Sequence, residues 1–226
     1  MAIEEHNFTS IEAAADELAG NLASAMRGAI SARGGALLAV SGGNTPKYVF
    51  ERLHQYNVDW RHVQVTLTDE RWVPVDHPDS NEKLVRSCLL QGPAAAATFI
   101  SLFGGEESSE KGQSACEERL KTLMMPFDAV YVGMGDDGHF ASLFPGDPAL
   151  HVHNSLCVAV SATESRLPRI SLTLPAILNA NKIFLLFSGQ KHSIYSKAKQ
   201  PGSIEEIPLR LLLSQERTPI TVLTAP

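Results

Sequence analysis

The chain has 226 residues, of which 44% are hydrophobic and 19% charged, and its formal net charge at pH 7 is −6. This composition is typical of a globular protein and excludes a fibrous or disordered one. The negative charge argues against a nucleic-acid-binding or anionic-membrane surface, because either needs a basic face, so an anionic ligand would have to meet local positive groups.

The N-terminal residues, the apolar runs and the cysteines indicate where the protein is located and whether its thiols are oxidised. The first residues, MAIEEHNF, carry acid where a signal peptide carries base, and no apolar run approaches the roughly 20 residues of a membrane span. We therefore expect a cytoplasmic protein without a membrane contact. Cys88, Cys116 and Cys157 are odd in number and lie far apart, so we expect packed, reduced thiols rather than a disulfide framework or a zinc site.

A long helix is predicted first, at about 10–32. Thr9-Ser10-Ile11-Glu12 has the form of a capping box, apolar residues follow at helical spacing, and Gly34-Gly35 ends the pattern. Short apolar runs follow, at 36–40, 63–68, 128–133, 156–160, 183–187 and 220–224. Further helices are expected between them, at 46–56, 80–91, 106–124, 170–179 and 190–199.

Runs this short, apolar on both faces and separated by helices, predict a largely parallel sheet with helices on both faces. No linker is long enough to divide the chain, so we expect a single α/β domain over 1–226. The stretches that look chemical come directly after strands: SGGNTP after 40, TDER after 67, GMGDDGH after 132 and SGQKH after 187. In an open parallel sheet these positions meet at the carboxyl edge, where ligands bind.

The first of these stretches favours a phosphate site. Gly42 and Gly43 free the backbone after Ser41, and Thr45-Pro46 fits a helix start, where exposed N–H groups bind anions. An ordinary glycine-rich turn explains the same residues equally well.

A serine nucleophile is a second interpretation of this stretch. AVSGG differs at one position from the G-x-S-x-G nucleophile elbow. Ser41, then Asp69 or Asp137, then His139 also follow the chain order of an α/β-hydrolase.

The second stretch, TDERWVP, places Asp69, Glu70 and Arg71 at a strand end. Arg71 is suited to an anion or a carbonyl oxygen. Glu70 is explained adequately by a solvated, charged turn.

The third stretch, GMGDDGH, matches the spacing of a dinucleotide fingerprint, but Asp136 and Asp137 place negative charge where a pyrophosphate would lie. A tight strand-to-helix turn explains the glycines. His139, at the start of the helix expected there, can take a proton from water, and Asp137 can fix its tautomer. We expect no nucleotide cofactor.

The fourth stretch, SGQKH, adds Lys191, and Arg169 precedes the helix expected at 170–179. Either cation alone is more often a surface charge. Together with the Ser41 loop they could neutralise a phosphate dianion. His151 and His153 lie two residues apart but have no third candidate ligand nearby, so we expect no metal site.

Taken in this order, SGGNTP, TDERWVP, GMGDDGHFASLFPG and SGQKH resemble the 6-phosphogluconolactonase family, within the wider superfamily of glucosamine-6-phosphate isomerase/deaminase. The resemblance covers nearly the whole chain, and the pairing of DERWVP with GxGxDGHxASLFPG is highly specific. It implies a Rossmann-like α/β domain that hydrolyses 6-phospho-D-glucono-1,5-lactone to 6-phosphogluconate, the second step of the oxidative pentose phosphate pathway, without metal or organic cofactor.

The resemblance also implies roles for single residues. His139 matches the general base on water, with Asp137 and Asp69 as its acidic neighbours. The remaining matched positions bind substrate: the phosphate loop Ser41, Gly42, Gly43 and Thr45, the basic residues Lys191 and Arg169, and the motif arginine Arg71. The related deaminases carry a ring-opening carboxylate five residues after the histidine, where this chain has Phe144, and this departure favours the lactonase.

Two alternatives remain open: an esterase with Ser41 as nucleophile, and a sugar-phosphate-binding protein without catalysis. The expected partner is a sugar-phosphate lactone, with no nucleic acid, and the expected assembly is a monomer or a small homo-oligomer.

Overall fold

The computed structural model describes residues 3–226, so the first two residues of the predicted domain lie outside the described residues. Within that range the chain forms a seven-stranded sheet in the order β1-β10-β9-β6-β2-β3-β5 and a three-stranded sheet in the order β4-β8-β7. Every neighbouring pair in the large sheet is parallel. Both pairs in the small sheet are antiparallel.

The strands are β1 (Glu4–Asn7), β2 (Ala36–Val40), β3 (Val63–Leu67), β4 (Asp69–Arg71), β5 (Thr98–Phe99), β6 (Ala129–Val132), β7 (Cys157–Val160), β8 (Arg169–Leu172), β9 (Ile183–Ser188) and β10 (Ile220–Ala225). The helices are α1 (Ile11–Arg33), α2 (Thr45–Leu53), α3 (Asn81–Cys88), α4 (Ser109–Leu120), α5 (Leu174–Leu178), α6 (Lys191–Ala198) and α7 (Leu209–Leu213). Short 3₁₀ turns lie at Trp60–His62, Gly92–Ala96 and Pro148–His151.

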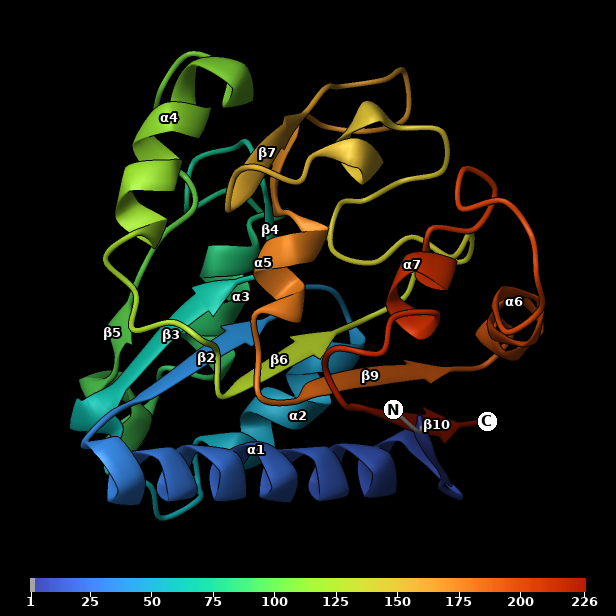
Figure 1. The fold of residues 1–226 in the computed structure, drawn as a ribbon. Coiled ribbons are helices and arrows are strands. Elements are labelled where there is room, and N and C mark those ends of the chain that lie inside the picture. Colours follow the sequence, from blue (N-terminus) through green and yellow to red (C-terminus); the bar gives the residue numbers. More distant parts are fainter. Residues whose placement is uncertain (1–2) are drawn as a thin grey trace.

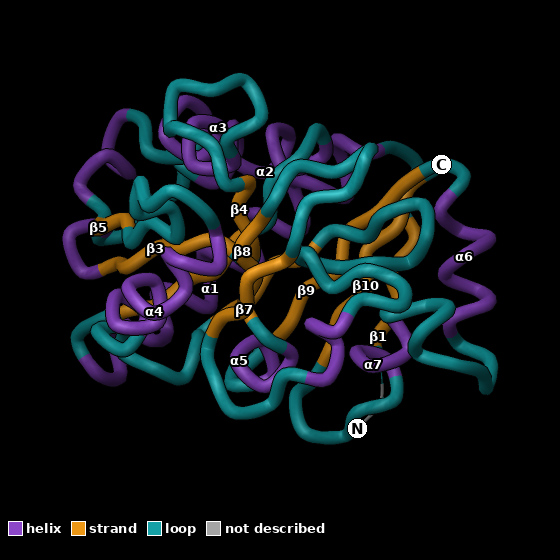
Figure 2. Tube along the Cα trace, turned by 90° about the horizontal axis from the view of Figure 1, so that it is seen from above, coloured by secondary structure: helices purple, strands orange, loops and turns teal. Residues whose placement is uncertain are grey.

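The elements form layers around the large sheet. Figure 1 shows α1 along one face of that sheet, with α5, α7 and the small sheet on the other face. From above, β4, β8 and β7 cross the middle of the molecule, between β3 and β5 on one side and β10 and β1 on the other (Figure 2). The five inner strands of the large sheet, β10, β9, β6, β2 and β3, are buried along almost their whole length, as expected for a sheet covered on both faces. The edge strands β1 and β5 are exposed or half-buried.

The first helix illustrates how local sequence sets an element. Ser10 caps α1 by accepting a hydrogen bond from the backbone N of Ala13 at 3.2 Å, and Gly34 ends it with a φ of +80°. The buried stripe between these ends includes Leu18, Leu22 and Met26. Its spacing follows the helical period, so α1 covers the sheet with one apolar face.

The predicted largely parallel sheet with helices on both faces is confirmed, and so are the strands at 36–40, 63–68, 128–133, 183–187 and 220–224, with ends shifted by a residue or two. The strand at 156–160 exists, but its placement in the parallel sheet was wrong, because β7 pairs antiparallel with β8. Three further strands and one helix were not predicted: β1, β4, β5 and α7.

The helix predicted at 170–179 was also wrong. Arg169–Leu172 is the strand β8, and α5 covers only Leu174–Leu178. Thr173 caps α5 by accepting from the backbone N of Ala176 at 3.3 Å, and a proline lies in the first turn. These helix-start signals lie four residues later than the predicted start, which leaves the preceding residues free to form a strand.

Among residues 3–226, no helix combines the length and the apolar character that crossing a membrane requires. The three cysteines are free thiols, with Cys116 and Cys157 buried and Cys88 half-buried.

Candidate active site

The carboxyl ends of four parallel strands surround a cleft of about 240 Å³. The loops after β2, β3, β6 and β9 supply most of its lining. Nine of the ten site residues predicted from the sequence line this cleft: Ser41, Gly42, Gly43, Thr45, Asp69, Arg71, His139, Arg169 and Lys191. The tenth, Asp137, lies behind His139 and contacts it.

The glycine-rich loop after β2 passes very close to α3. A Cβ at Gly42 would lie 1.9 Å from Oδ1 of Asn81, so no side chain fits there. Gly43 has a φ of +109°, in the region that favours glycine. Asn44, which precedes α2, makes no side-chain capping bond. The loop therefore places its backbone N–H groups beside the start of α2, and exposed N–H groups at a helix start bind anions.

His139 is fixed from three directions. Its Nδ1 lies 2.5 Å from Oδ1 of Asp137, which also accepts from the backbone N of His139 at 3.0 Å. Its ring packs against that of Phe144, with centroids 4.3 Å apart and the planes tilted by 38°. A Cβ at Gly135 would lie 2.1 Å from the imidazole, so glycine is required there. Nδ1 is thus occupied, and Nε2 has no protein partner within residues 3–226.

Asp137 is suited to hold the imidazole in one tautomer. Partial burial would raise the pKa of this carboxyl, but the hydrogen bonds and the charge of His139 outweigh burial, and the pKa lies below its usual value. Asp137 is therefore ionised at neutral pH. An ionised carboxylate on Nδ1 keeps the proton there and leaves Nε2 as a proton acceptor.

The helix predicted to begin at His139 was wrong. Gly138 has a φ of +80° and Ala141 a φ of +49°, and both values are incompatible with an α-helix. Residues 136–147 form a series of turns instead. The left-handed backbone at Ala141 directs the chain so that the next residue, Ser142, is completely buried.

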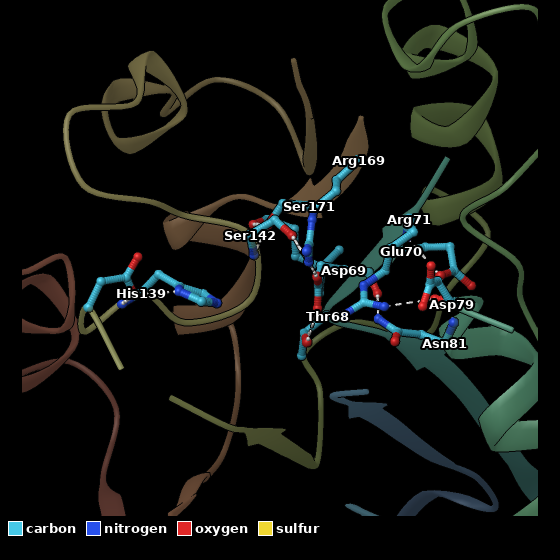
Figure 3. A network of polar contacts seen from close by, with 12 residues as sticks. Thr68, Asp69, Glu70, Arg71, Asp79, Asn81, His139, Ser142, Arg169 and Ser171 are labelled. Atoms are coloured by element: carbon cyan, nitrogen blue, oxygen red, sulfur yellow. Dashed lines mark hydrogen bonds and ion pairs between the residues drawn. The ribbon is translucent and has the colours of Figure 1, made fainter. Parts of the chain in front are cut away.

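Asp69 belongs to a different cluster, on the other side of the cleft (Figure 3). Its side chain is 6% exposed, and its Oδ2 accepts from Oγ of Ser142 at 2.5 Å and from Nη1 of Arg169 at 3.4 Å. Thr68 donates to its other oxygen at 3.4 Å. The structure therefore pairs His139 with Asp137, whereas Asp69 pairs with Ser142 and Arg169.

Positive groups gather along the cleft, although the whole chain is acidic. Arg71 of β4 lies directly opposite Arg169 of β8 in the small sheet. Burial lowers the pKa of Arg169, Asp69 opposes this effect, and Arg71 adds to it. Like charges opposite one another destabilise a strand pair, so an anion bound between them would be favourable. Lys191, at the first residue of α6, reaches the cleft and donates to the carbonyl of Met134 at 2.5 Å.

The structure corrects the interpretation of Glu70 as part of a solvated turn, because its side chain is completely buried. It accepts hydrogen bonds from three backbone N–H groups and from Ser80. Burial raises the pKa of Glu70 to about 7, against the lowering effect of these N–H donors. Alternation along β4 explains the difference, since Asp69 and Arg71 face the cleft and Glu70 faces away.

Sequence reasoning missed two residues of the site: Asn81, which lines the cleft, and Ser142, which is buried behind it. Asn81 donates from Nδ2 to the carbonyl of Asp69 at 2.9 Å and lines the cleft. Its signal was the run DSNE, in which Ser80 caps α3. Ser142 lies within the FASLF stretch, where its apolar neighbours gave no sign of a polar role.

Within residues 3–226, no group of three His, Cys, Asp or Glu side chains is arranged to bind a metal ion. His151 pairs with Glu205, its Nε2 lying 2.6 Å from Oε1.

The family model for glucosamine-6-phosphate isomerases/6-phosphogluconolactonase matches residues 9–221. A 6-phosphogluconolactonase of Rhizobium meliloti is 35% identical over 232 residues, with the whole of both chains covered. One from Pseudomonas aeruginosa is 40% identical over 213 residues, covering 91% of this chain and 87% of the relative. The crystal structure of a 6-phosphogluconolactonase from Shewanella baltica is 38% identical and superposes with a TM-score of 0.96, covering 100% of this chain and 98% of that one.

Proposed function

Because the chain belongs to the glucosamine-6-phosphate isomerase/6-phosphogluconolactonase family, we infer that it is an enzyme that hydrolyses 6-phospho-D-glucono-1,5-lactone to 6-phospho-D-gluconate. This reaction is the second step of the oxidative pentose phosphate pathway. Full-length relatives that carry the lactonase name support this assignment. The observation that carries the chemistry is the His139–Asp137 pair at the edge of a cleft rich in cations.

We propose that the substrate phosphate binds between the loop from Ser41 to Thr45 and the cations of the cleft. Gly42 and Gly43 bring backbone N–H groups close to the phosphate oxygens, and the start of α2 adds its dipole. Lys191 and Arg169 supply the positive charge that an acidic protein needs at such a site.

His139 acts as the general base. Nε2 takes a proton from a water molecule while the water oxygen forms a bond to the lactone carbonyl carbon C1. The carbonyl oxygen becomes an oxyanion, which Arg71 or local N–H groups stabilise. The bond from C1 to the ring oxygen then breaks, and the ring oxygen takes the proton from Nε2. The products are a carboxylic acid, which ionises, and a hydroxyl group.

Asp137 supports His139 during this cycle, since it stabilises the imidazolium that forms between the two proton transfers. The family resemblance implies a reaction without metal or organic cofactor. Phe144 occupies the position at which the related deaminases carry a ring-opening carboxylate. A lactone needs no such group, because its carbonyl carbon is already electrophilic.

A serine esterase is the first alternative. A nucleophile elbow places its serine in a strained turn and bonds it to the catalytic histidine. Ala141 is the one non-glycine residue with a positive φ within residues 3–226, and Ser41 is not hydrogen-bonded to His139 there. Ser41 thus has the surroundings of a phosphate-loop residue. A covalent mechanism would make Ser41→Ala inactive and would allow an organophosphate to label the protein.

A sugar-phosphate-binding protein without catalysis is the second alternative. It would bind the phosphate and leave hydrolysis at the spontaneous rate. The Asp137–His139 pair has no use in such a protein, which favours the enzyme. We further propose that the enzyme acts in the cytoplasm, as a monomer or a small homo-oligomer, without nucleic acid as a partner.

The test is proton release after freshly generated 6-phosphogluconolactone is added to the pure protein. Unphosphorylated gluconolactone and the His139→Ala variant are run beside it, and spontaneous hydrolysis gives the baseline. Fast release that requires both the phosphate and His139 is expected. Release at the baseline rate would contradict the proposed function, and normal release by Ser41→Ala would contradict the serine esterase.

A further inference from the structure

Glu70 is a buried carboxylate that collects four donors where β4 meets α3. Oε1 accepts from the backbone N of Arg71 and of Asn81, both at 2.7 Å. Oε2 accepts from the backbone N of Glu82 at 2.7 Å and from Oγ of Ser80 at 3.2 Å. One side chain therefore joins a strand of the small sheet to the first turn of α3, across the loop of residues 72–79.

The first consequence of this junction is the position of Asn81, whose own backbone N–H is bound to Glu70. Its side chain is almost completely buried between two parts of the cleft. On one side it donates to the carbonyl of Asp69 at 2.9 Å. On the other its Oδ1 lies against Gly42, where even a Cβ would approach to 1.9 Å. A shift of Asn81 would thus move both the phosphate loop and Asp69.

The second consequence is the position of Arg71. Its backbone N–H is bound to Glu70, and its Nη1 donates to the carbonyl of Asp79 at 2.8 Å. Asp79 directly precedes the α3 cap, Ser80. The guanidinium is therefore fixed by the same loop end whose position Glu70 determines. Figure 3 shows Glu70, Arg71, Asp79 and Asn81 together on one side of the cleft.

We propose that Glu70 is a positioning residue for the cleft, acting through Asn81 and Arg71 to fix the phosphate loop and the cationic side in register with each other. This inference rests on the proposed lactonase function for its kinetic readout. Glu70 itself touches no substrate, because it is completely buried and does not line the cleft.

The chemistry of the site requires a carboxyl group. Both oxygens of a carboxyl group can accept hydrogen bonds, and all four partners of Glu70 are donors. Glutamine has the same shape but replaces one oxygen by an NH₂ group, which would face at least one backbone N–H. Glu70→Gln must therefore break contacts at one end, and the first turn of α3 has to move relative to β4.

The experiment compares Glu70→Gln, Asn81→Ala and the double variant with a matched control, Glu82→Gln. Glu82 is a buried carboxylate on the same helix, but its side chain bonds Arg86 and Ser101 and does not line the cleft. Steady-state lactone hydrolysis is measured for each, together with binding of inorganic phosphate by calorimetry, which needs no turnover.

We expect Glu70→Gln and Asn81→Ala each to lower kcat/KM at least about tenfold and to weaken phosphate binding, with Glu82→Gln within twofold of wild type. Because the two residues act in series, the double variant should lose much less than the product of the single losses. Near-normal kcat/KM and phosphate binding in both single variants, or losses in Glu82→Gln of the same size, would overturn the inference. A wild type without lactonase activity would instead overturn the proposed function, and phosphate binding would still decide the role of Glu70.

Discussion

The two sides of the cleft each contain an aspartate, but they are built differently. The His139 side is a series of turns over residues 136–147, and the side chain of Asp137 is 49% exposed. The Asp69 side consists of β4, β8 and the start of α3, and the side chain of Asp69 is 6% exposed. One side is open and contacts the cleft with an imidazole, whereas the other is more closed and its aspartate is held by hydrogen bonds from Ser142 and Arg169.

This difference separates two aspartates that the sequence pattern treats alike. Asp137 bonds His139 directly and can serve proton transfer. Asp69 bonds Ser142 and Arg169, so its charge balances a largely buried guanidinium and fixes its direction. The comparison teaches that the same residue type, after two strands of one parallel sheet, can contact the proposed base on one side and a proposed binding group on the other.

The largest effect is expected on the open side. His139→Ala removes the proposed general base, which typically contributes about 10²–10⁴-fold in rate. We expect kcat to fall by that factor while phosphate binding changes little, because the proposed phosphate contacts do not include His139. Proton release at saturating lactone measures it. His151→Ala, at an exposed histidine paired with Glu205, is the matched control and should keep full activity.

On the closed side, the main effect expected from a substitution is a lower free energy of unfolding. Asp69→Asn leaves the largely buried Arg169 without its counter-charge, and breaking a buried ion pair costs on the order of 3 kcal/mol in the free energy of unfolding. Asp137→Asn, at a half-exposed pair, should cost less than about 1 kcal/mol. Urea denaturation of both variants measures the difference. Equal losses would mean that the two sides are not built as differently as their burial indicates.

A smaller effect is expected for Lys191. Lys191→Ala should raise KM about tenfold with kcat nearly unchanged, because a charge-assisted phosphate contact of roughly 1.4 kcal/mol corresponds to that factor. Lys197→Ala, one helical turn or more further along α6, is the control. An unaltered KM in the Lys191 variant would make this residue a surface lysine.

A pH dependence of the free energy of unfolding is also expected, from Glu70. Its pKa in the folded protein is raised by burial to about 7, above its ordinary value of 4.5. The folded state therefore retains the proton more tightly than the unfolded state, so this contribution to stability is complete below pH 4.5 and is lost as pH rises toward 7. Glu70→Gln should lack this component. Parallel pH profiles of unfolding free energy for wild type and variant would contradict the assignment.

The sequence was sufficient for the parallel sheet and for the meeting of the four polar stretches, because short runs apolar on both faces predict buried parallel strands whose ends share one edge. It was insufficient for β8. Ile170 and Leu172 fit a strand or a helix, and the deciding pairing with β4 lies about 100 residues away in the chain.

The burial of Glu70 was not predictable for a related reason. The donors to the Glu70 side chain are mostly backbone N–H groups, which give no signal in the sequence. Those of Asn81 and Glu82 reach Glu70 only after the loop of residues 72–79 has folded back. The pairing of Ser142 with Asp69 likewise depends on the left-handed backbone of Ala141, a conformation that alanine rarely adopts.

The division between the two sides is tested most directly by a double-mutant cycle on kcat. Asp137→Asn and Asp69→Asn are each measured in wild type and in the His139→Ala background. If Asp137 acts only through His139, Asp137→Asn lowers kcat in wild type but not in His139→Ala, while Asp69→Asn lowers it by the same factor in both. An equal loss from Asp137→Asn in both backgrounds, or a loss from Asp69→Asn that disappears with His139, would contradict the account.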